Sequence, residues 1–516
     1  MTVFRPAPLA QTTRCAVLPA LAIALTLALS PNAFAIDLAQ AFESAQRYDT
    51  LLNSARLQLD AARERLPQAQ AGLKPSLGAV AGATAGRLDT DVAASRSFDN
   101  LSGGLNFSYP LYRPGNSTLV DQAAIGVELA QTQLAQAAQD LVTRVSTAYF
   151  DVLSAMDGVE VAIAQRRAIS EQFEAAKRNF EVGTATVTDQ QEAQARLDLN
   201  AAQLAAARND LSIRRAALSQ LTGLDSEELN TLKLDVPLPV AEPNSLDDWT
   251  ARARTGNFGV RQAELAVATA RKEIDRARFA KRPVVDLVSQ ASVLQGKTAS
   301  TVTTPVDRSS TLSAGVQLSV PLYSGGGLDA RERETIAALQ KSESDLENVR
   351  RVADQGARQA FLGLKSSTEQ ARALEAAVRS SRLALESNLL GYQVGVRVNV
   401  DVLNSQQQLF QAFRDLSRAR YDVLINTLRL KSTAGELQSA DIAAVNGLLS
   451  PSVGRNFPVL GSGAPATVPA APAGTAARPG ARTRPAPVVP RDFGGRTTKP
   501  IAPGEPRVGP RAPMPR

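Results

Sequence analysis

The sequence contains no histidine among its 516 residues, and its single cysteine is Cys15. Without imidazole, the chain cannot use histidine acid–base chemistry, Ser-His-Asp or Cys-His nucleophiles, or most zinc sites. One cysteine allows neither an internal disulfide framework nor a thiolate cluster. We therefore expect a protein that is not an enzyme, with no catalytic residues, no cofactor and no metal site.

Aromatic residues are also scarce, at 4% of the chain. An ordinary globular core uses more of them, whereas this sequence is rich in Ala, Leu, Gln and charged residues. That composition is typical of long helices that meet along narrow seams.

The first 35 residues contain Arg5 and Arg14 but no acidic residue. An apolar run over 16–29 is followed by Ala33-Phe34-Ala35, an A-x-A cleavage pattern. This predicts a secretory signal peptide at 1–35, with a mature chain that begins at Ile36. The alternative, a membrane anchor, would need roughly 20 apolar residues. Cys15 precedes the apolar run, so it is badly placed for lipid attachment.

Charge is unevenly distributed along the chain. The formal net charge is +7, but residues 451–516 hold ten Lys or Arg and two Asp or Glu. Together with the +2 of residues 1–35, this leaves −3 for 36–450. The basic balance therefore belongs to the tail and does not indicate nucleic-acid binding. The tail also holds 15 of the 29 prolines, so we expect 451–516 to be disordered. Contact of the tail with an anionic cell-wall polymer is the alternative to a solvated tail.

The body of the chain is a duplication. The segment 106–112 (NFSYPLY) returns at 317–323 (QLSVPLY), and 180–183 (FEVG) returns at 392–395 (YQVG). The offsets, 211 and 212 residues, are too long for a solenoid repeat and indicate two copies of one supersecondary plan. We place the copies at 36–223 and 245–450, joined by a connector at 224–244.

Each copy is expected to begin with a helical segment, continue with two strands and end in a long helical hairpin. The segments are 37–72 and 246–282, and no proline interrupts 115–180. A helix over that range would be about 100 Å long at 1.5 Å per residue. Apolar residues recur every three and four positions, a spacing typical of coiled-coil packing: Leu134, Ala138, Leu141, Val145, Ala148, Val152, Ala155 and Val159, and then Leu409, Ala412, Leu416, Ala419 and Val423.

The strands carry the sharper signal. Apolar and polar residues alternate over 100–110 and 312–321, and less cleanly over 76–87 and 284–294. Nine to eleven residues with one apolar face match an outer-membrane β-strand, although a half-buried soluble hairpin has the same pattern. Loops are expected at 88–98 and 295–311. Pro110 and Pro321 fall where each second strand should bend into its helix.

Four strands cannot close a barrel, and open sheet edges are not tolerated in lipid. If the strands span a membrane, several chains must therefore share one barrel. The fold class that we predict is mainly α with a transmembrane β-barrel, built from a duplicated unit of two β-strands and a long coiled-coil hairpin.

Several motifs resemble the TolC family of outer-membrane channel-tunnels. They are 147–153 (TAYFDVL), 180–183 with Thr188-Asp189, 392–395 with 400–403 (VDVL), and 419–426 (ARYDVLIN). The resemblance spans about 37–445. It implies a homotrimer with a 12-stranded barrel in outer-membrane lipid, a helical tunnel across the periplasm, and no nucleic-acid partner. It also implies docking to a periplasmic adaptor and to an inner-membrane ABC or proton-driven exporter, for type I protein secretion or efflux.

The two hairpin tips, near 183–189 and 395–401, form the expected site. Gly183 and Gly395 should end the descending helices. The resemblance implies that the residues matching Thr188, Asp189, Tyr392 and Arg397 hold a periplasmic gate shut, and that Asp401 lines an acidic entrance ring. A second acidic ring position is occupied here by Asn404.

A structural role is the alternative for the same tip residues. Asp189 with Glu192, or Thr188 with Gln191, fits a capping box for the return helix, and Asp401 fits an N-cap. At the level of function, the alternative to an export duct is a non-conducting trimeric coiled-coil scaffold or adaptor, which would need no lipid-facing strands.

Overall fold

The computed structural model describes residues 35–90, 93–225, 228–233, 237, 239–297 and 308–451. The expected signal peptide before Ala35 and all but the first residue of the expected tail lie outside these residues. The first repeat contains α2 (Leu38–Tyr48), α3 (Thr50–Ala71), β1 (Ser76–Thr90), β2 (Ala93–Tyr112), α4 (Pro114–Glu181) and α5 (Val187–Thr222). The second contains α6 (Leu246–Gly256), α7 (Phe258–Phe279), β4 (Val284–Lys297), β5 (Arg308–Ser319), α8 (Gly327–Gln393) and α9 (Asn399–Thr433).

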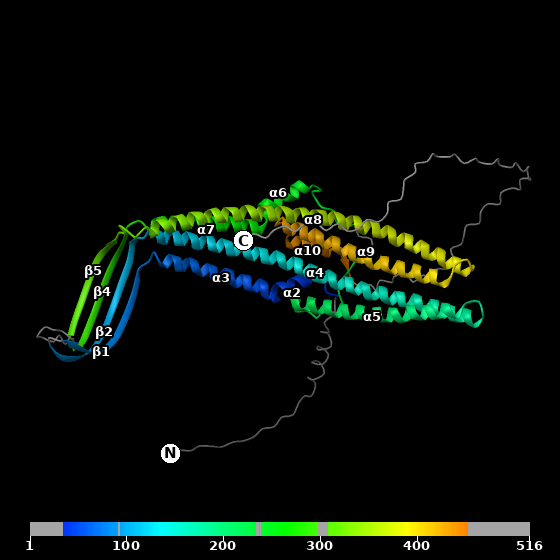
Figure 1. Ribbon diagram of the computed structural model, residues 1–516, viewed down its shortest axis with the longest axis horizontal. Helices are drawn as coiled ribbons and strands as arrows, with labels where there is room; N and C mark the ends of the chain where they lie inside the picture. The colour runs from blue at the N-terminus through cyan, green and yellow to red at the C-terminus, as the bar shows by residue number, and fades with distance from the viewer. Residues whose placement is uncertain are drawn as a thin grey trace, which may run out of the picture. The chain divides into compact units, whose positions relative to one another are not determined.

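The two repeats match element for element (Figure 1). The hairpin helices have 68 and 36 residues in the first repeat and 67 and 35 in the second. The prediction of a mainly helical, duplicated fold of strand pairs and long hairpins is confirmed. Within the described ranges, no helix has both the length and the hydropathy to cross a membrane.

Each expected 35-residue helical segment is divided into two helices. Asp49 ends α2 and caps α3, and Asn257 does the same for α6 and α7. Each side chain accepts a hydrogen bond from a backbone N–H of the helix that follows. Asp and Asn favour this position because they satisfy donors that the first turn leaves unpaired.

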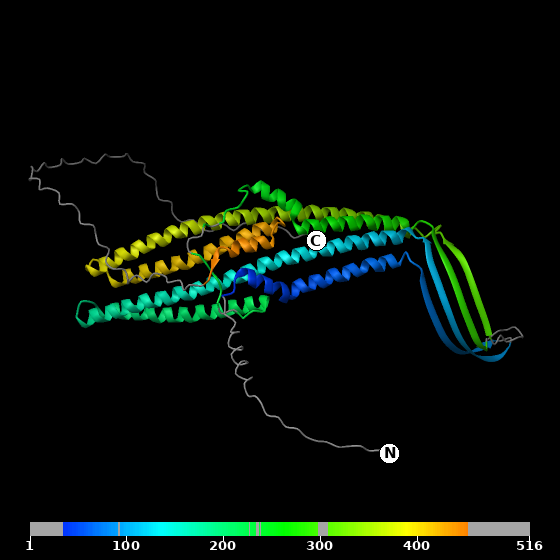
Figure 2. The ribbon, with the colours of Figure 1, turned by 180° about the vertical axis from the view of Figure 1, so that it is seen from behind.

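The long hairpins pack through the seams expected from the heptad spacing. Leu141, Val145 and Val152 are fully buried in the first hairpin. In the second, Leu409, Ala412, Leu416, Ala419 and Val423 are all buried. Figure 2 shows α4 and α9 adjacent from behind, where the largest core cluster joins the two hairpins. Alanine in these seams lets the helices approach closely.

Motif 147–153 lies at the centre of this core. Phe150 stacks on Tyr421 with 5.7 Å between ring centroids, and Tyr149 meets Phe150 edge-on at 5.9 Å. The buried Tyr149 hydroxyl lies 3.0 Å from the carbonyl of Ile36 and 2.9 Å from that of Asn230. It therefore holds the start of the described chain and the connector against α4.

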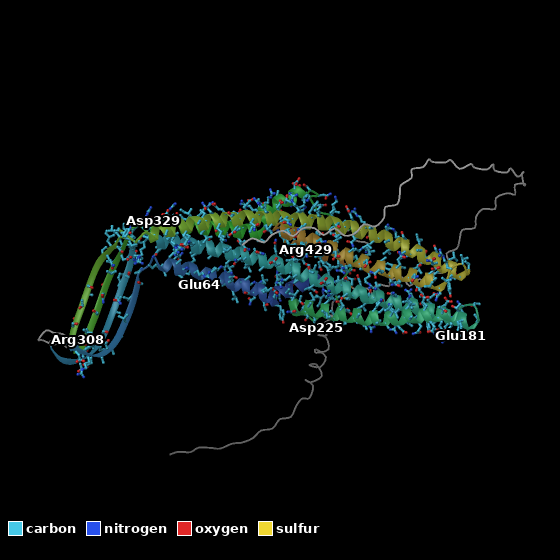
Figure 3. All side chains as sticks on the ribbon, in the orientation of Figure 1. Glu64, Glu181, Asp225, Arg308, Asp329 and Arg429 are labelled. Carbon is cyan, nitrogen blue, oxygen red and sulfur yellow. The ribbon has the colours of Figure 1, made fainter. Side chains whose placement is uncertain are left out.

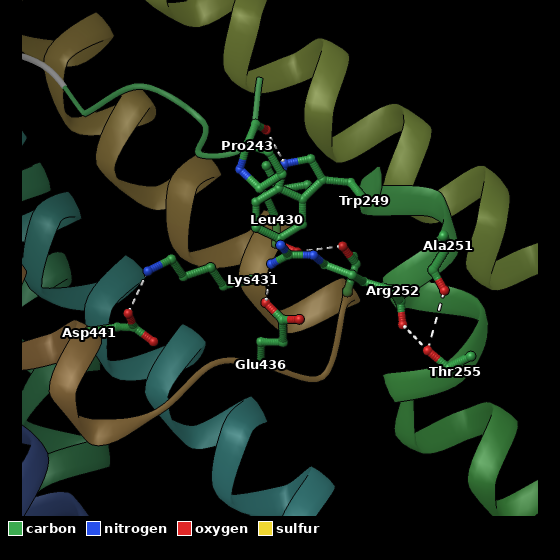
Figure 4. A network of polar contacts seen from close by, with 10 residues as sticks. Pro243, Trp249, Ala251, Arg252, Thr255, Leu430, Lys431, Glu436 and Asp441 are labelled. Atoms are coloured by element: carbon green, nitrogen blue, oxygen red, sulfur yellow. Dashed lines mark hydrogen bonds and ion pairs between the residues drawn. The ribbon is translucent and has the colours of Figure 1, made fainter. Parts of the chain in front are cut away.

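Three elements near the connector are additional to the sequence prediction. They are β3 (Thr231–Leu232), α10 (Ser439–Asn446) and β6 (Leu449–Ser450), and β3 pairs with β6. Trp249 fixes the connector to the second repeat (Figure 4). Its indole donates to the Pro243 carbonyl at 2.8 Å, and Arg252 lies over its ring and pairs with Glu436 at 3.0 Å.

The four long strands form one antiparallel sheet in the order β1-β2-β4-β5. The strands are longer than expected. β1 continues to Thr90 and β2 begins at Ala93, so most of the loop expected at 88–98 is strand. Similarly, β4 continues to Lys297 and β5 begins at Arg308, inside the loop expected at 295–311. Backbone pairing with a neighbouring strand sustains these ends although the hydropathy alternation fades there.

Candidate functional site

The two hairpin tips adopt the same backbone turn. Gly183 and Gly395 each lie two residues beyond a helix end, with φ of +78° and +77°. This left-handed conformation favours glycine because a Cβ atom would be strained there. The backbone N–H groups of the two residues that follow each glycine donate to one carbonyl, that of Asn179 in the first tip and that of Gly391 in the second. The tips are therefore two copies of one turn, and they differ in their side chains.

The structure corrects the expected caps of the return helices. In the first tip the N-cap is Thr186, which has extended backbone angles, and Asp189 completes its capping box. The Asp189 carboxylate accepts from the Thr186 hydroxyl at 2.7 Å and from its backbone N–H at 3.0 Å. The boxes expected for Asp189 with Glu192 and for Thr188 with Gln191 are wrong because α5 begins before them, at Val187.

The second tip differs from the expectation as well. The N-cap of α9 is Val398, and Asp401 lies inside the first turn rather than at the cap. The Asp401 carboxylate faces the guanidinium of Arg397 at 3.6 Å, with the two side chains 35% and 57% exposed. An exposed pair of this kind contributes only about 0–1 kcal/mol, so both groups are available to other partners.

Polar side chains join the two hairpins of one chain just behind the tips. Asn179 of α4 donates to the Tyr392 hydroxyl of α8 at 3.3 Å. Asn399, which is 1% exposed, donates to the Asp189 carbonyl at 3.3 Å and accepts from Gln172 at 2.5 Å. Of the four expected gate residues, the structure thus brings Tyr392 and Asp189 to the junction of the hairpins. It places Thr188 on the first turn of α5 and Arg397 on the exposed second tip.

A further contact lies about one to three turns along the return helices. Arg196 of α5 donates to Asn404 of α9 at 2.8 Å and also to Gln407. The family resemblance implies a second acidic ring at the position of Asn404. Here that position carries a neutral amide, which accepts a hydrogen bond from the Arg196 guanidinium. Sequence reasoning missed Arg196, Asn399 and Gln172, because their partners lie more than 200 residues away in the chain.

The ends of the long helices that lie away from the tips lead into the sheet. Figure 3 labels Arg308 in the sheet and Glu181 at the end of α4, next to the first tip. The sheet has one apolar face. Directly paired residues share a face in an antiparallel sheet, and the pairing places apolar residues of all four strands together. They include Leu77 on β1, Leu101, Leu105, Phe107 and Tyr109 on β2, Leu287 on β4, and Leu312, Val316 and Leu318 on β5. We call this set the apolar face; the reverse face carries mainly Ser, Gly, Thr, Asn and Gln.

The strand-to-helix junctions differ from the prediction in one respect. Pro110 lies within β2, at an irregularity in the pairing with β4, and the strand continues to Tyr112. Proline is tolerated there because a bulge needs no ladder donor. The helix instead starts at Pro114, the first residue of α4, where a missing N–H costs nothing. Pro321 follows the end of β5 and precedes α8.

Among the residues that the structure describes, no cluster of acidic, cysteine or histidine side chains could hold a metal ion. What the described chain presents is structural: an exposed apolar sheet face at one end of the long helices and paired polar tips at the other.

Two copies of a strand pair and a long helical hairpin, with the strands joined in one sheet that exposes an apolar face, are the plan of an outer-membrane channel. The family described as "Outer membrane efflux protein" matches residues 42–224 and 249–436, and the chain belongs to this family, which includes TolC. It is thus an outer-membrane efflux and secretion channel of the TolC family, a transport protein without enzymatic function.

Two relatives illustrate the match along most of their length. Outer membrane protein TolC of Vibrio cholerae is 31% identical over 430 residues, covering 83% of this chain and 98% of the relative. Alkaline protease secretion protein AprF of Pseudomonas aeruginosa is 32% identical over 441 residues, covering 82% and 89%.

Solved structures show the same fold at lower identity. CusC superposes with a TM-score of 0.66 at 19% identity, over 78% of this chain and 93% of CusC. The outer membrane protein VceC of Vibrio cholerae gives a TM-score of 0.64 at 19% identity, over 77% and 96%.

Proposed function

We propose that three copies of the chain form a homotrimer whose twelve strands close one barrel in the outer membrane. The helical hairpins would continue the barrel wall as a tunnel across the periplasm, with the tail 451–516 also on the periplasmic side. The observation that carries this proposal is the four-stranded sheet, which has a continuous apolar face and two strands, β1 and β5, at its open edges.

The edges argue for a shared barrel on energetic grounds. Each edge strand leaves backbone N–H and C=O groups on its outer side without a partner strand among the residues that the structure describes. In hydrocarbon no water can satisfy them, and each unsatisfied group costs several kcal/mol. Pairing β5 of one chain with β1 of another removes both edges, and a ring of such contacts closes the sheet.

Energy for transport would come from partner proteins, since the described tip residues make structural polar contacts. We propose an inner-membrane ABC or proton-driven exporter, joined to the duct by a periplasmic adaptor protein. The name of the relative AprF, an alkaline protease secretion protein, supports type I secretion of protein cargo. Efflux of small molecules through the same duct would depend on which exporter docks.

We further propose that the tips form the closed periplasmic entrance. Within one chain, Tyr392 and Asp189 already lie where the hairpins meet, whereas the Arg397 side chain is more than half exposed and faces Asp401 at 3.6 Å. In a ring, the second tip of one chain lies beside the first tip of the next. Arg397 would then donate to Thr188 and Asp189 of that neighbour, and Asp401 would line the aperture.

The molar mass of the detergent-solubilised protein tests the assembly. We expect one species with the mass of three chains after correction for detergent, measured by light scattering during size exclusion. A monodisperse monomer would contradict the shared barrel and favour the non-conducting scaffold.

A further inference from the structure

A small polar cavity lies between the two hairpins of one chain, behind the tips. Residues of α4, α5 and α9 line it, and α4 lies between the other two helices in Figures 1 and 2. The cavity has a volume of about 60 Å³, which is enough for several water molecules or one small ion. Its polar lining consists of two arginines, Arg196 and Arg414, and of side-chain amides from all three helices. No carboxylate lines it within the described part of the chain.

Asn200 of α5 is a buried polar side chain of this cavity that lacks hydrogen-bond partners. It is 1% exposed, and neither the oxygen nor the nitrogen of its amide makes a hydrogen bond to the described residues. A buried amide left in this state costs free energy, so such groups in folded proteins are normally satisfied by protein, water or a ligand. Because Asn200 lines the cavity, the molecule or ion that occupies the cavity is placed to complete these bonds.

The cavity also has a surplus of positive charge. Glu192, one turn before Arg196 on α5, lies 3.6 Å from its guanidinium and offsets that charge. Arg414 forms no ion pair with any residue that the structure describes. Asp415 follows it on α9, but this acid does not line the cavity, and it accepts from the Gln411 amide at 2.9 Å. The lining therefore carries an excess of about one positive charge, which one monovalent anion would neutralise.

Contacts within the lining leave N–H groups as donors. The Arg196 guanidinium donates to the side-chain oxygen of Asn404 at 2.8 Å and to that of Gln407. The oxygen of the Gln407 amide is thus occupied, and its NH₂ group remains as a donor. An anion could accept hydrogen bonds from such amides and from the guanidiniums, and hydrogen bonds to a charged partner are the stronger kind.

We propose that this cavity binds one small monovalent anion of the size of chloride. The unsatisfied amide of Asn200 and the unpaired guanidinium of Arg414 are its principal ligands, and Arg196 holds the opposite wall. The bound anion links the first hairpin, through α4 and α5, to α9 of the second. The site is complete within one chain, so it goes beyond the proposed function and does not depend on the trimer.

Thermal unfolding of the detergent-solubilised full chain, followed by circular dichroism, tests for binding. Sodium chloride should raise the unfolding midpoint by a few degrees over sodium gluconate at the same ionic strength, because gluconate is too large for the cavity and a ligand of the folded state stabilises it. Arg414→Gln removes the unpaired charge and should abolish this rise. Arg208→Gln removes an exposed arginine of α5 outside the cavity and should keep the rise in full.

Asn200→Leu separates an anion site from a structural defect. Leucine is close to asparagine in size and brings no polar atom, so in gluconate the variant should be at least as stable as the wild type. Chloride should then add no further stability. Crystals grown in sodium bromide locate the anion directly: the wild type should show one anomalous peak per chain in the cavity, and Asn200→Leu should show none.

Several outcomes would overturn the site. One is a chloride-dependent rise of the same size in Arg414→Gln and in the wild type. Another is ordered water in the cavity of the bromide-grown crystals, without an anomalous signal. Stabilisation by sodium sulfate while chloride has no effect would overturn the assignment to a monovalent anion. The molar mass of the solubilised protein is a separate measurement, so these outcomes leave the proposed trimer untouched.

Discussion

Single residues fix the helix breaks and caps, and these were the hardest features to predict from sequence. The first tip offers Thr184, Thr186 and Thr188 as caps. Only the extended backbone at Thr186 selects one of them, and that conformation depends on the turn set by Gly183. The links of Asn399 and Arg196 between hairpins carry no local signal at all, because their partners become neighbours only when the repeats pack.

Asp49 is the residue whose substitution should be most informative for stability. Its carboxylate, 5% exposed, accepts from Arg144 at 3.0 and 2.8 Å while it caps α3. Hydrogen bonds from Arg144 hold the pKa of Asp49 below its ordinary value of 3.8. A carboxyl whose pKa is depressed on folding stabilises the fold above its unfolded pKa, and this contribution is lost as pH falls through the folded value.

Asp49→Asn should therefore lower the thermal midpoint at pH 7, because the cap remains but Arg144 loses its charged partner. Removing one member of a buried pair costs about 3–5 kcal/mol, and the partial exposure of Arg144 puts the expected loss below that range. Circular dichroism from pH 7 to pH 3 should show the variant and wild type converging below pH 4. Glu43→Gln, which breaks an exposed pair with Arg47, is the control and should change little. A constant difference between Asp49→Asn and wild type at all pH values would contradict the assignment.

At the scale of elements, periodicity predicted most of the fold. Helices with a 3.5-residue seam and strands with alternating faces both carry a repeating signal, and the repeat supplied it twice. The ends of the strands were not predicted, because β2 extends for 20 residues, longer than its alternating stretch, and its first residues are held by pairing with β1. The paired strands β3 and β6 were not predicted, because two residues in each strand are too few to show an alternating pattern.

The apolar face predicts opposite results for adjacent substitutions on β2. Leu105→Arg would place a cation on the lipid side, at a cost of about 2–4 kcal/mol near the membrane centre, and should reduce the amount of assembled protein in the outer membrane. Asn106→Arg, on the reverse face, should assemble normally because that face meets water. Fractionation with heat-modifiability on gels measures both. Equal assembly of the two variants would contradict the orientation of the sheet.

In the proposed trimer, the whole molecule depends on contacts that one chain cannot make. The open edges of the sheet and the half-exposed Arg397 have no complete set of partners within the described chain, and a sequence can specify such contacts only through symmetry. The repeat provides part of that symmetry, because it places two copies of the strand pair side by side in one sheet.

The tail should be dispensable for this assembly. Residues 451–516 lack a periodic apolar pattern and hold half of the prolines, so ordering them would cost entropy without burial in return. Truncation after Ser450 keeps the β3–β6 pair intact and should leave the trimeric mass and export unchanged. Loss of the trimer on truncation would show that the tail is a structural element of the assembly.

Single-channel conductance in planar bilayers tests the central claim, a trimeric duct closed at its hairpin tips, most directly. Arg397→Ser with Tyr392→Phe removes the donors from the second tip, far from the strands. One exposed Arg–carboxylate link is weak, about 0.2–1 kcal/mol, but in the proposed trimer three symmetric copies would together bias the entrance toward closure. We predict discrete conductance steps for the wild type and a larger conductance for the double variant, with the trimer unchanged. Equal conductance of the two proteins, with trimers intact, would contradict the closure of the duct by these residues.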